Sequence, residues 1–119
     1  MGVERGLRER ITIAAQYELN ERYPMTRYIT LLNFTAQGAK NIQKSTTRAH
    51  AFDKLAAKAG VKVEGQYWTE GRYDGVLILG ADSERKVLHL LAELAALGNV
   101  RTETMRAFVD TEFDAIVAK

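Results

Sequence analysis

Four consecutive aliphatic residues, Val76-Leu77-Ile78-Leu79, constrain the fold of this 119-residue chain more than any other feature. Successive side chains of an extended strand point to opposite faces of a sheet, so this segment is apolar on both faces. Such a strand is typical of the centre of a sheet that is covered on both sides. The run is far shorter than the roughly 20 apolar residues of a membrane-spanning helix. We therefore predict a globular domain with no membrane partner and a cytoplasmic location.

Apolar periodicity around this run predicts an alternation of strands and helices. Strand patterns cover residues 28–34, 61–69, 72–79 and 100–108, and helical patterns cover 35–59 (with a break near Lys44), the segment between Gly80 and Gly98, and a short stretch after Asp110. This βαββαβ order with a C-terminal helix is the split-βαβ pattern of ferredoxin-like domains. We predict an α+β fold, with a four-stranded antiparallel sheet that carries two helices on one face.

Residues 1–24 differ from the rest of the chain. They hold four Glu and four Arg, show a ragged apolar pattern, and end at the only proline, Pro24. We interpret this segment as an N-terminal appendage and residues 25–119 as the single domain. One hypothesis is that translation begins at Met25, because every strong pattern starts just after it.

Composition excludes several kinds of chemistry. The chain has no cysteine, so it can form no disulfide, thiol nucleophile or thiolate metal site. His50 and His89 fall on the polar sides of their predicted helices, which makes them poor candidates for metal ligands or bases. We therefore predict no metal and no cofactor. The net charge of +2 is too small to indicate nucleic-acid binding, which is the least favoured function.

The sheet face opposite the helices is expected to be apolar. In the first strand Ile29 and Leu31 alternate with Leu32, and in the third strand Val76 and Ile78 alternate with other apolar residues. An uncovered apolar face of this size is unusual on a monomer. We therefore predict a homodimer or a higher homo-oligomer formed by sheet-on-sheet association.

The predicted topology brings polar residues together at one end of the sheet. The first and second strands end there, and the third and fourth strands begin there. Arg48 falls close to an apolar stripe, where a charge needs a partner such as Asp74, and a helix N-terminus at this end favours an anion. The candidate ligand-binding residues are Gln37, Arg48, Trp68, Gly71, Tyr73, Asp74, Asn99, Arg101 and Thr102.

The motif Gly71-Arg72-Tyr73-Asp74 resembles the signature of the GYD domain family. The resemblance covers about residues 26–119 and includes Thr35-Ala36-Gln37-Gly38, Tyr67-Trp68-Thr69 and the segment Gly98 to Thr102. It implies a ferredoxin-like fold related to dimeric α/β barrels, and it implies no established activity.

Three functions remain open on the sequence alone. The first is binding of a small metabolite, for which an anion is a candidate, at the end of the sheet that bears the motif. If the protein is an enzyme, Tyr73 and Asp74 are the candidate acid–base pair, with Arg48 or Arg101 to stabilise charge. The second is a structural or regulatory oligomerisation module, in which Asp74 only anchors an arginine. The third is nucleic-acid binding.

Overall fold

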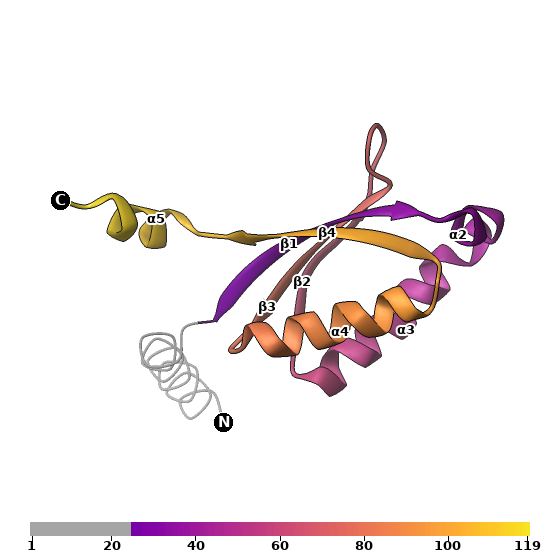
Figure 1. Cartoon of the computed structure of the whole chain (residues 1–119), viewed down its shortest axis with the longest axis horizontal. Coiled ribbons are helices and arrows are strands. Elements are labelled where there is room, and N and C mark those ends of the chain that lie inside the picture. The colour runs from indigo at the N-terminus through magenta and orange to yellow at the C-terminus, as the bar shows by residue number, and fades with distance from the viewer. Residues whose placement is uncertain (1–24) are drawn as a thin grey trace, which may run out of the picture.

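A computed structural model describes residues 25–119 (Figure 1). The interpretation of residues 1–24 as an appendage, and of Met25 as the start of translation, lies outside the described residues. Within them the elements are β1 (Thr26–Phe34), α2 (Ala36–Lys40), the short 3-10 helix η1 (Ile42–Lys44), α3 (Ser45–Ala59), β2 (Lys62–Trp68), β3 (Gly75–Ala81), α4 (Glu84–Ala96), β4 (Val100–Ala107) and α5 (Asp110–Val117).

The strands form one four-stranded sheet in the order β2-β3-β1-β4, and every neighbouring pair is antiparallel. β1 and β2 therefore run parallel to each other, with β3 between them. Figure 1 shows α3 and α4 side by side across one face of the sheet, whereas α5 lies beyond the end of β4 and away from both helices. The predicted α+β class, the ferredoxin-like order and the placement of the helices on one face are confirmed.

The core fills the space between the sheet and these two helices. Leu77 and Leu79 of β3 are buried there, together with Phe52 of α3 and with Val87 and Leu90 of α4. Val87 and Leu90 are three residues apart, so they lie on the same face of α4. The helix ends that frame the core depend on glycine: Gly60 follows α3 with a φ of 77°, a left-handed conformation that few other residues adopt.

β2 carries a bulge between Val63 and Gly65. A bulge adds one residue to a strand and so reverses which face the following side chains occupy. Gln66 and Trp68 therefore reach side chains of α3, while Tyr67 lies 59% exposed. Simple alternation along residues 61–69 predicts that Tyr67 lies on the same face of the sheet as Val63. The bulge between these two residues is the physical reason why it does not.

The third strand begins later than predicted, at Gly75 rather than at Arg72. The preceding residues form a loop closed by Thr69, whose amide donates to the Asp74 carbonyl (3.0 Å) and whose hydroxyl donates to the Tyr73 carbonyl (2.6 Å). These bonds within the loop take the place of strand pairing.

The sheet face opposite the helices carries apolar side chains from three strands. Ile29 pairs in register with Ile78 on one side and with Met105 on the other. Val76 and Ile78 are only partly buried, because no other element of residues 25–119 covers them. Burial of β3 on both faces is therefore not complete within residues 25–119.

Candidate functional site

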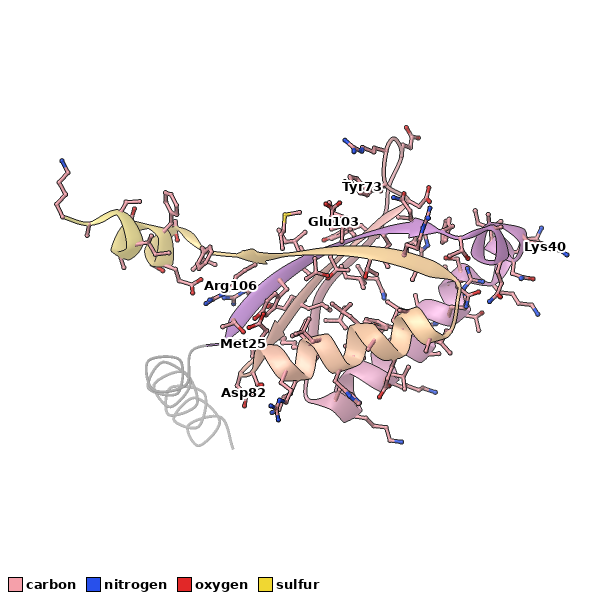
Figure 2. The ribbon with its side chains drawn as sticks, in the orientation of Figure 1. Met25, Lys40, Tyr73, Asp82, Glu103 and Arg106 are labelled. Carbon is pink, nitrogen blue, oxygen red and sulfur yellow. The ribbon has the colours of Figure 1, made fainter. Side chains whose placement is uncertain are left out.

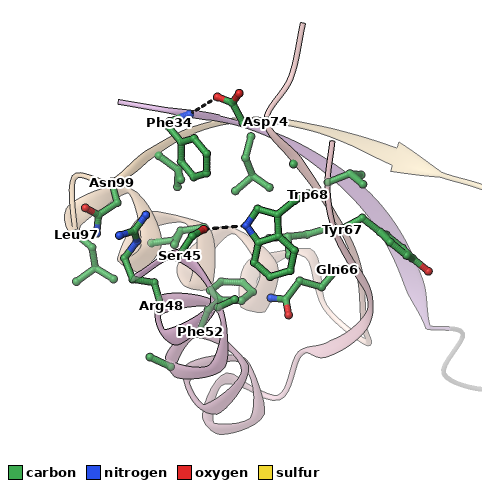
Figure 3. Close-up of a pocket in the computed structure, with 18 of the residues that line it drawn as sticks. Phe34, Ser45, Arg48, Phe52, Gln66, Tyr67, Trp68, Asp74, Leu97 and Asn99 are labelled. Carbon is green, nitrogen blue, oxygen red and sulfur yellow. Dashed lines mark hydrogen bonds between the residues drawn. The ribbon is translucent and has the colours of Figure 1, made fainter. Parts of the chain in front are cut away.

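A cavity of about 300 Å³ lies between the sheet and the helices (Figure 3). Its lining includes the last residues of β1 and β2, Phe34 and Trp68, and the first residues of β3 and β4, Gly75 and Val100. The cavity therefore lies at the end of the sheet where the topology predicts that the motif residues converge. Its volume is at the small end of the range for ligand pockets.

Most of the cavity wall is apolar. The apolar lining residues are Leu32, Phe34, Ala49, Ala51, Phe52, Leu55, Gly75, Val76, Leu77, Leu94, Leu97 and Val100. The remaining lining residues are Ser45, Arg48, Gln66, Trp68, Asp74, Asn99 and Tyr67, although the Tyr67 side chain extends away from the cavity (Figure 3). An apolar concave wall with a few polar side chains is the usual composition of a small-molecule site.

The nine residues predicted for the site divide into two groups. Arg48, Trp68, Asp74 and Asn99 line the cavity, and Gln37 bonds to one of them. The other four are not in the cavity lining: Gly71, Tyr73, Arg101 and Thr102.

Arg48 lies in the first turn of α3 and is partly buried. Its guanidinium donates to the carbonyl oxygens of Asn41 (2.8 Å) and Gly38 (3.4 Å). No carboxylate of residues 25–119 forms an ion pair with it. The predicted pairing of Arg48 with Asp74 is thus replaced by bonds to main-chain carbonyls at the end of α2.

Asp74 has a different partner. Its Oδ2 accepts a 2.8 Å hydrogen bond from the amide of Phe34, and its own amide donates to the carbonyl of Leu32 (2.8 Å). The main-chain pairing of β1 with β3 ends at Leu32 and Gly75. The Asp74 carboxylate therefore adds one more hydrogen bond to the ladder between β1 and β3, and its side-chain oxygen takes the place of a main-chain carbonyl.

One hydrogen bond joins Trp68, on β2, to Ser45, on α3, beside the cavity. The indole N–H of Trp68 donates to the Ser45 hydroxyl oxygen at 2.8 Å (Figure 3). Two residues earlier in β2, Gln66 donates a hydrogen bond to Asp53 of α3 at 3.3 Å. These bonds hold β2 and α3 together beside the cavity.

Asn99 belongs to a hydrogen-bonded turn that joins α4 to β4. Gln37 donates through Nε2 to Oδ1 of Asn99 (2.9 Å) and to the carbonyl of Leu97 (3.1 Å). Thr35 donates through its hydroxyl to the carbonyl of Gly98 (2.6 Å), and a Cβ on Gly38 would overlap the carbonyl of Asn99. The motif Thr35 to Gly38 therefore has a clear structural role: it fixes α2 against this turn.

Tyr73 lies apart from the cavity, on the side of the sheet away from α3 and α4 (Figure 2). Its hydroxyl donates to Oε2 of Glu103 at 2.8 Å. This hydrogen bond, with a smaller contribution from burial and from the negative charge of Glu103, raises the pKa of Tyr73 above its usual value of 10.0. The guanidinium of Arg72 lies 5.8 Å from the centre of the Tyr73 ring and acts in the opposite direction.

The other residues outside the cavity have simple structural positions. Gly71 is in the loop before β3 and has a φ of 93°, with no atom near the place of a Cβ. Arg101 is exposed and pairs in register with Asn33, whereas Thr102 pairs with Leu32 and is partly buried.

The predicted site omits most of the residues that line the cavity, among them Ser45, Phe52 and Gln66. Phe52 follows Arg48 by four residues, so helical spacing alone puts the two on one face of α3 and could have indicated it. Gln66 reaches α3 only because of the bulge in β2, which leaves no clear sequence signal.

Residues 25–119 lack the features of two other kinds of site. No group of three His, Cys, Asp or Glu side chains is placed to hold a metal ion in this part of the chain. No helix there has the length and apolar character needed to cross a bilayer. Of the histidines, His50 is exposed, and His89 lies 2.7 Å from the carboxylate of Glu93 on α4.

The fold and the cavity thus define a ferredoxin-like α+β domain with a mainly apolar cavity at one end of its sheet. The family model of the GYD domain matches residues 28–117, and the chain belongs to this family. The resemblance noted in the sequence is therefore confirmed. No curated protein matches the chain.

Proposed function

We propose that this GYD domain protein binds a small metabolite with an apolar body in the cavity between the sheet and α3. The cavity itself is the observation that carries the proposal, because it is lined by apolar side chains and by four of the residues predicted for the site. Burial of an apolar ligand in such a space is favourable by about 25 cal/mol per Å² of apolar surface removed from water.

The contacts of the motif residues favour binding over acid–base catalysis. Asp74 is bonded to a main-chain amide, and Tyr73 is bonded to Glu103 outside the cavity. No hydrogen bond joins Tyr73 to Asp74 among the described residues. A general base must be within hydrogen-bond reach of the proton that it abstracts, and these two side chains serve other partners.

Uptake of an uncharged fluorescent probe, N-phenylnaphthylamine, tests the proposal. Trp68 is the only tryptophan of the chain and lies at the cavity, so excitation transfer from Trp68 to the probe reports binding there. We expect saturable transfer in the wild-type protein. Ala49→Leu should reduce probe affinity at least fivefold, because the larger side chain fills part of the cavity.

Ala92→Leu is the matched control, because Ala92 is exposed on α4 and does not line the cavity. It should leave probe affinity unchanged. Absence of saturable transfer in the wild-type protein, or an equal loss of affinity in both variants, would refute binding in this cavity.

A second candidate function is association with another copy of the chain through the open sheet face. We define this face by Ile29, Leu31, Tyr67, Val76, Ile78 and Met105, of which Tyr67 and Met105 are 59% and 45% exposed. Two charged neighbours of this face have partners within the chain: Arg27 pairs with Glu64 at 3.1 Å, and Glu103 accepts from Tyr73. A face whose centre is apolar suits a second copy of itself better than a charged partner.

A further inference from the structure

We infer that the ligand of the cavity carries a single carboxylate, so that the ligand class is a monocarboxylate with an apolar body. This inference rests on the proposed function and specifies the chemistry of the same site. It depends on a group of donors formed by Arg48, Ser45 and Asn99, all of which line the cavity.

Arg48 provides a positive charge that no carboxylate of the described chain balances. Its two hydrogen bonds go to the uncharged carbonyls of Asn41 and Gly38. A guanidinium has five N–H donors, so several remain for a ligand. A partly buried charge beside an apolar wall gains from an anionic partner much more than an exposed charge does.

Asn99 and Ser45 each have one side-chain group already engaged. Oδ1 of Asn99 accepts from Gln37, so its free group is the Nδ2 donor. The hydroxyl oxygen of Ser45 accepts from the Trp68 indole, which leaves the hydroxyl hydrogen to donate. The hydrogen bonds of the protein thus leave each side chain with a free donor for a ligand.

These donors lie on one side of the cavity. Ser45 and Arg48 are three residues apart in the first turn of α3 and share a face of that helix. Arg48 donates to the carbonyl of Gly38, which is packed directly on the backbone of Asn99. Figure 3 shows Arg48 beside Asn99 and Ser45, whereas the Asp74 carboxylate points to the Phe34 amide. The N-terminus of the 15-residue helix α3 adds a partial positive charge on the same side.

The single positive charge of the lining favours a ligand with one negative charge over one with two. Arg48 is the only cation in the lining, and the one anion, Asp74, is directed to the Phe34 amide and away from Arg48. A phosphate dianion would leave at least one charge without a partner next to an apolar wall, which is costly. A carboxylate matches the planar guanidinium and brings a single charge.

Displacement of N-phenylnaphthylamine by matched ligands tests this inference separately from the proposed function. Cinnamate and cinnamamide have the same apolar body and differ in charge. We expect cinnamate to displace the bound probe at a concentration at least tenfold lower than cinnamamide. Phenyl phosphate should be a weaker competitor than cinnamate. If the probe binds but the acid and the amide compete equally, or neither competes, or phenyl phosphate is the strongest, the carboxylate class is wrong while the cavity still binds apolar molecules.

Arg48→Gln should remove the preference for cinnamate and leave the affinity for the uncharged probe within about twofold. Arg85→Gln is the control, because Arg85 is exposed on α4 outside the cavity. It should keep the full preference. If Arg48→Gln does not fold, Arg48→Lys keeps the charge and should retain part of the preference. A preference unchanged in Arg48→Gln, or the same loss in Arg85→Gln, would overturn the role of Arg48.

Discussion

At the scale of single residues, Asp74 shows how one side chain can serve as part of a sheet. The ladder between β1 and β3 ends at Leu32 and Gly75, and the amide of Phe34 would then have no strand partner on this side. The carboxylate of Asp74 accepts that amide at 2.8 Å. Because Phe34 lines the cavity, this bond also fixes one wall of the proposed site.

Replacement of Asp74 should separate this hydrogen bond from a role of its charge. Asp74→Ala leaves the Phe34 amide without its acceptor and should lower the free energy of unfolding by about 1–3 kcal/mol. Asp74→Asn keeps an acceptor oxygen of the same shape and should cost less than about 1 kcal/mol. Urea denaturation measures both. Equal losses in the two variants would contradict this role and would indicate that the negative charge itself is required.

Tyr73 provides a test by pH titration. Its pKa is raised, mainly by the hydrogen bond to Glu103, so the folded protein holds the phenol proton more tightly than the unfolded chain does. Stabilisation from this bond is therefore fully present below the pKa of an unfolded tyrosine and is lost as the pH rises through the higher folded value.

We expect the Tyr73 phenol to ionise above pH 10, the usual range for tyrosine. The ultraviolet absorbance of tyrosinate, measured as the difference between the wild type and Tyr73→Phe, follows this group alone. Glu103→Gln should move the midpoint down toward 10.0, because it removes the negative charge and the strongest acceptor. A midpoint that does not respond to Glu103→Gln would argue against the Tyr73–Glu103 bond in solution.

At the scale of elements, the short helix α2 is fixed to the turn between α4 and β4. Hydrogen bonds from Thr35 and Gln37 reach this turn, and the backbone of Gly38 lies directly against Asn99. This packing positions Asn99 at the cavity and supplies the carbonyl that Arg48 contacts. The arrangement explains why a glycine is needed at position 38 without any direct role in ligand binding.

Two glycine substitutions should therefore have different costs. Gly38→Ala forces a methyl group onto the Asn99 carbonyl and should destabilise the protein by about 3 kcal/mol, the upper part of the usual range for overpacking. Gly71→Ala meets no neighbouring atom, and its cost comes only from the left-handed φ of 93°, about 1–2 kcal/mol. Thermal and urea denaturation should rank them in this order. The reverse order would mean that α2 is not packed on the turn as described.

The order and direction of the elements could be predicted because they depend on local periodicity and on general rules of sheet topology. Convergence of Arg48, Trp68, Asp74 and Asn99 at one end of the sheet follows from the same rules. The partners of these side chains could not be predicted, because they depend on distances of a few ångströms. Asp74 was expected to pair with an arginine, yet the nearer partner is a main-chain amide.

The sequence also did not predict which side chains of β2 face the helices. Only the bulge between Val63 and Gly65 turns Trp68 toward α3, and a single glycine in a strand pattern does not specify where the bulge lies. The separation of Tyr73 from the cavity has a similar cause. The loop closed by Thr69 extends to Asp74, so Tyr73 precedes the regular strand and its side chain bonds with Glu103.

At the scale of the whole molecule, the exposed apolar surface of residues 25–119 includes two extended regions. One is the open sheet face, and the other is the C-terminal segment, where Phe108, Phe113, Ile116 and Val117 are each about half exposed. Figure 1 shows α5 extending away from the sheet and its two helices. Exposed apolar surface of this kind is typical of association sites, which agrees with the proposed association with a second copy of the chain.

Two adjacent residues of β3 allow the last prediction to distinguish assembly from folding. Leu77 is 4% exposed and packs in the core against the helices, whereas Ile78 points to the open sheet face. Leu77→Asp buries an unpaired charge and should abolish the folded state, seen as loss of the far-ultraviolet circular dichroism of the native protein. Ile78→Asp places the charge on the proposed interface and should keep that spectrum while the mass from light scattering falls to that of a monomer.

The wild type should be at least a dimer at micromolar concentration. A monomeric wild type, or an Ile78→Asp variant that stays fully assembled, would show that the open sheet face does not bind a second copy, because a charge in the middle of an apolar interface cannot be buried without a partner.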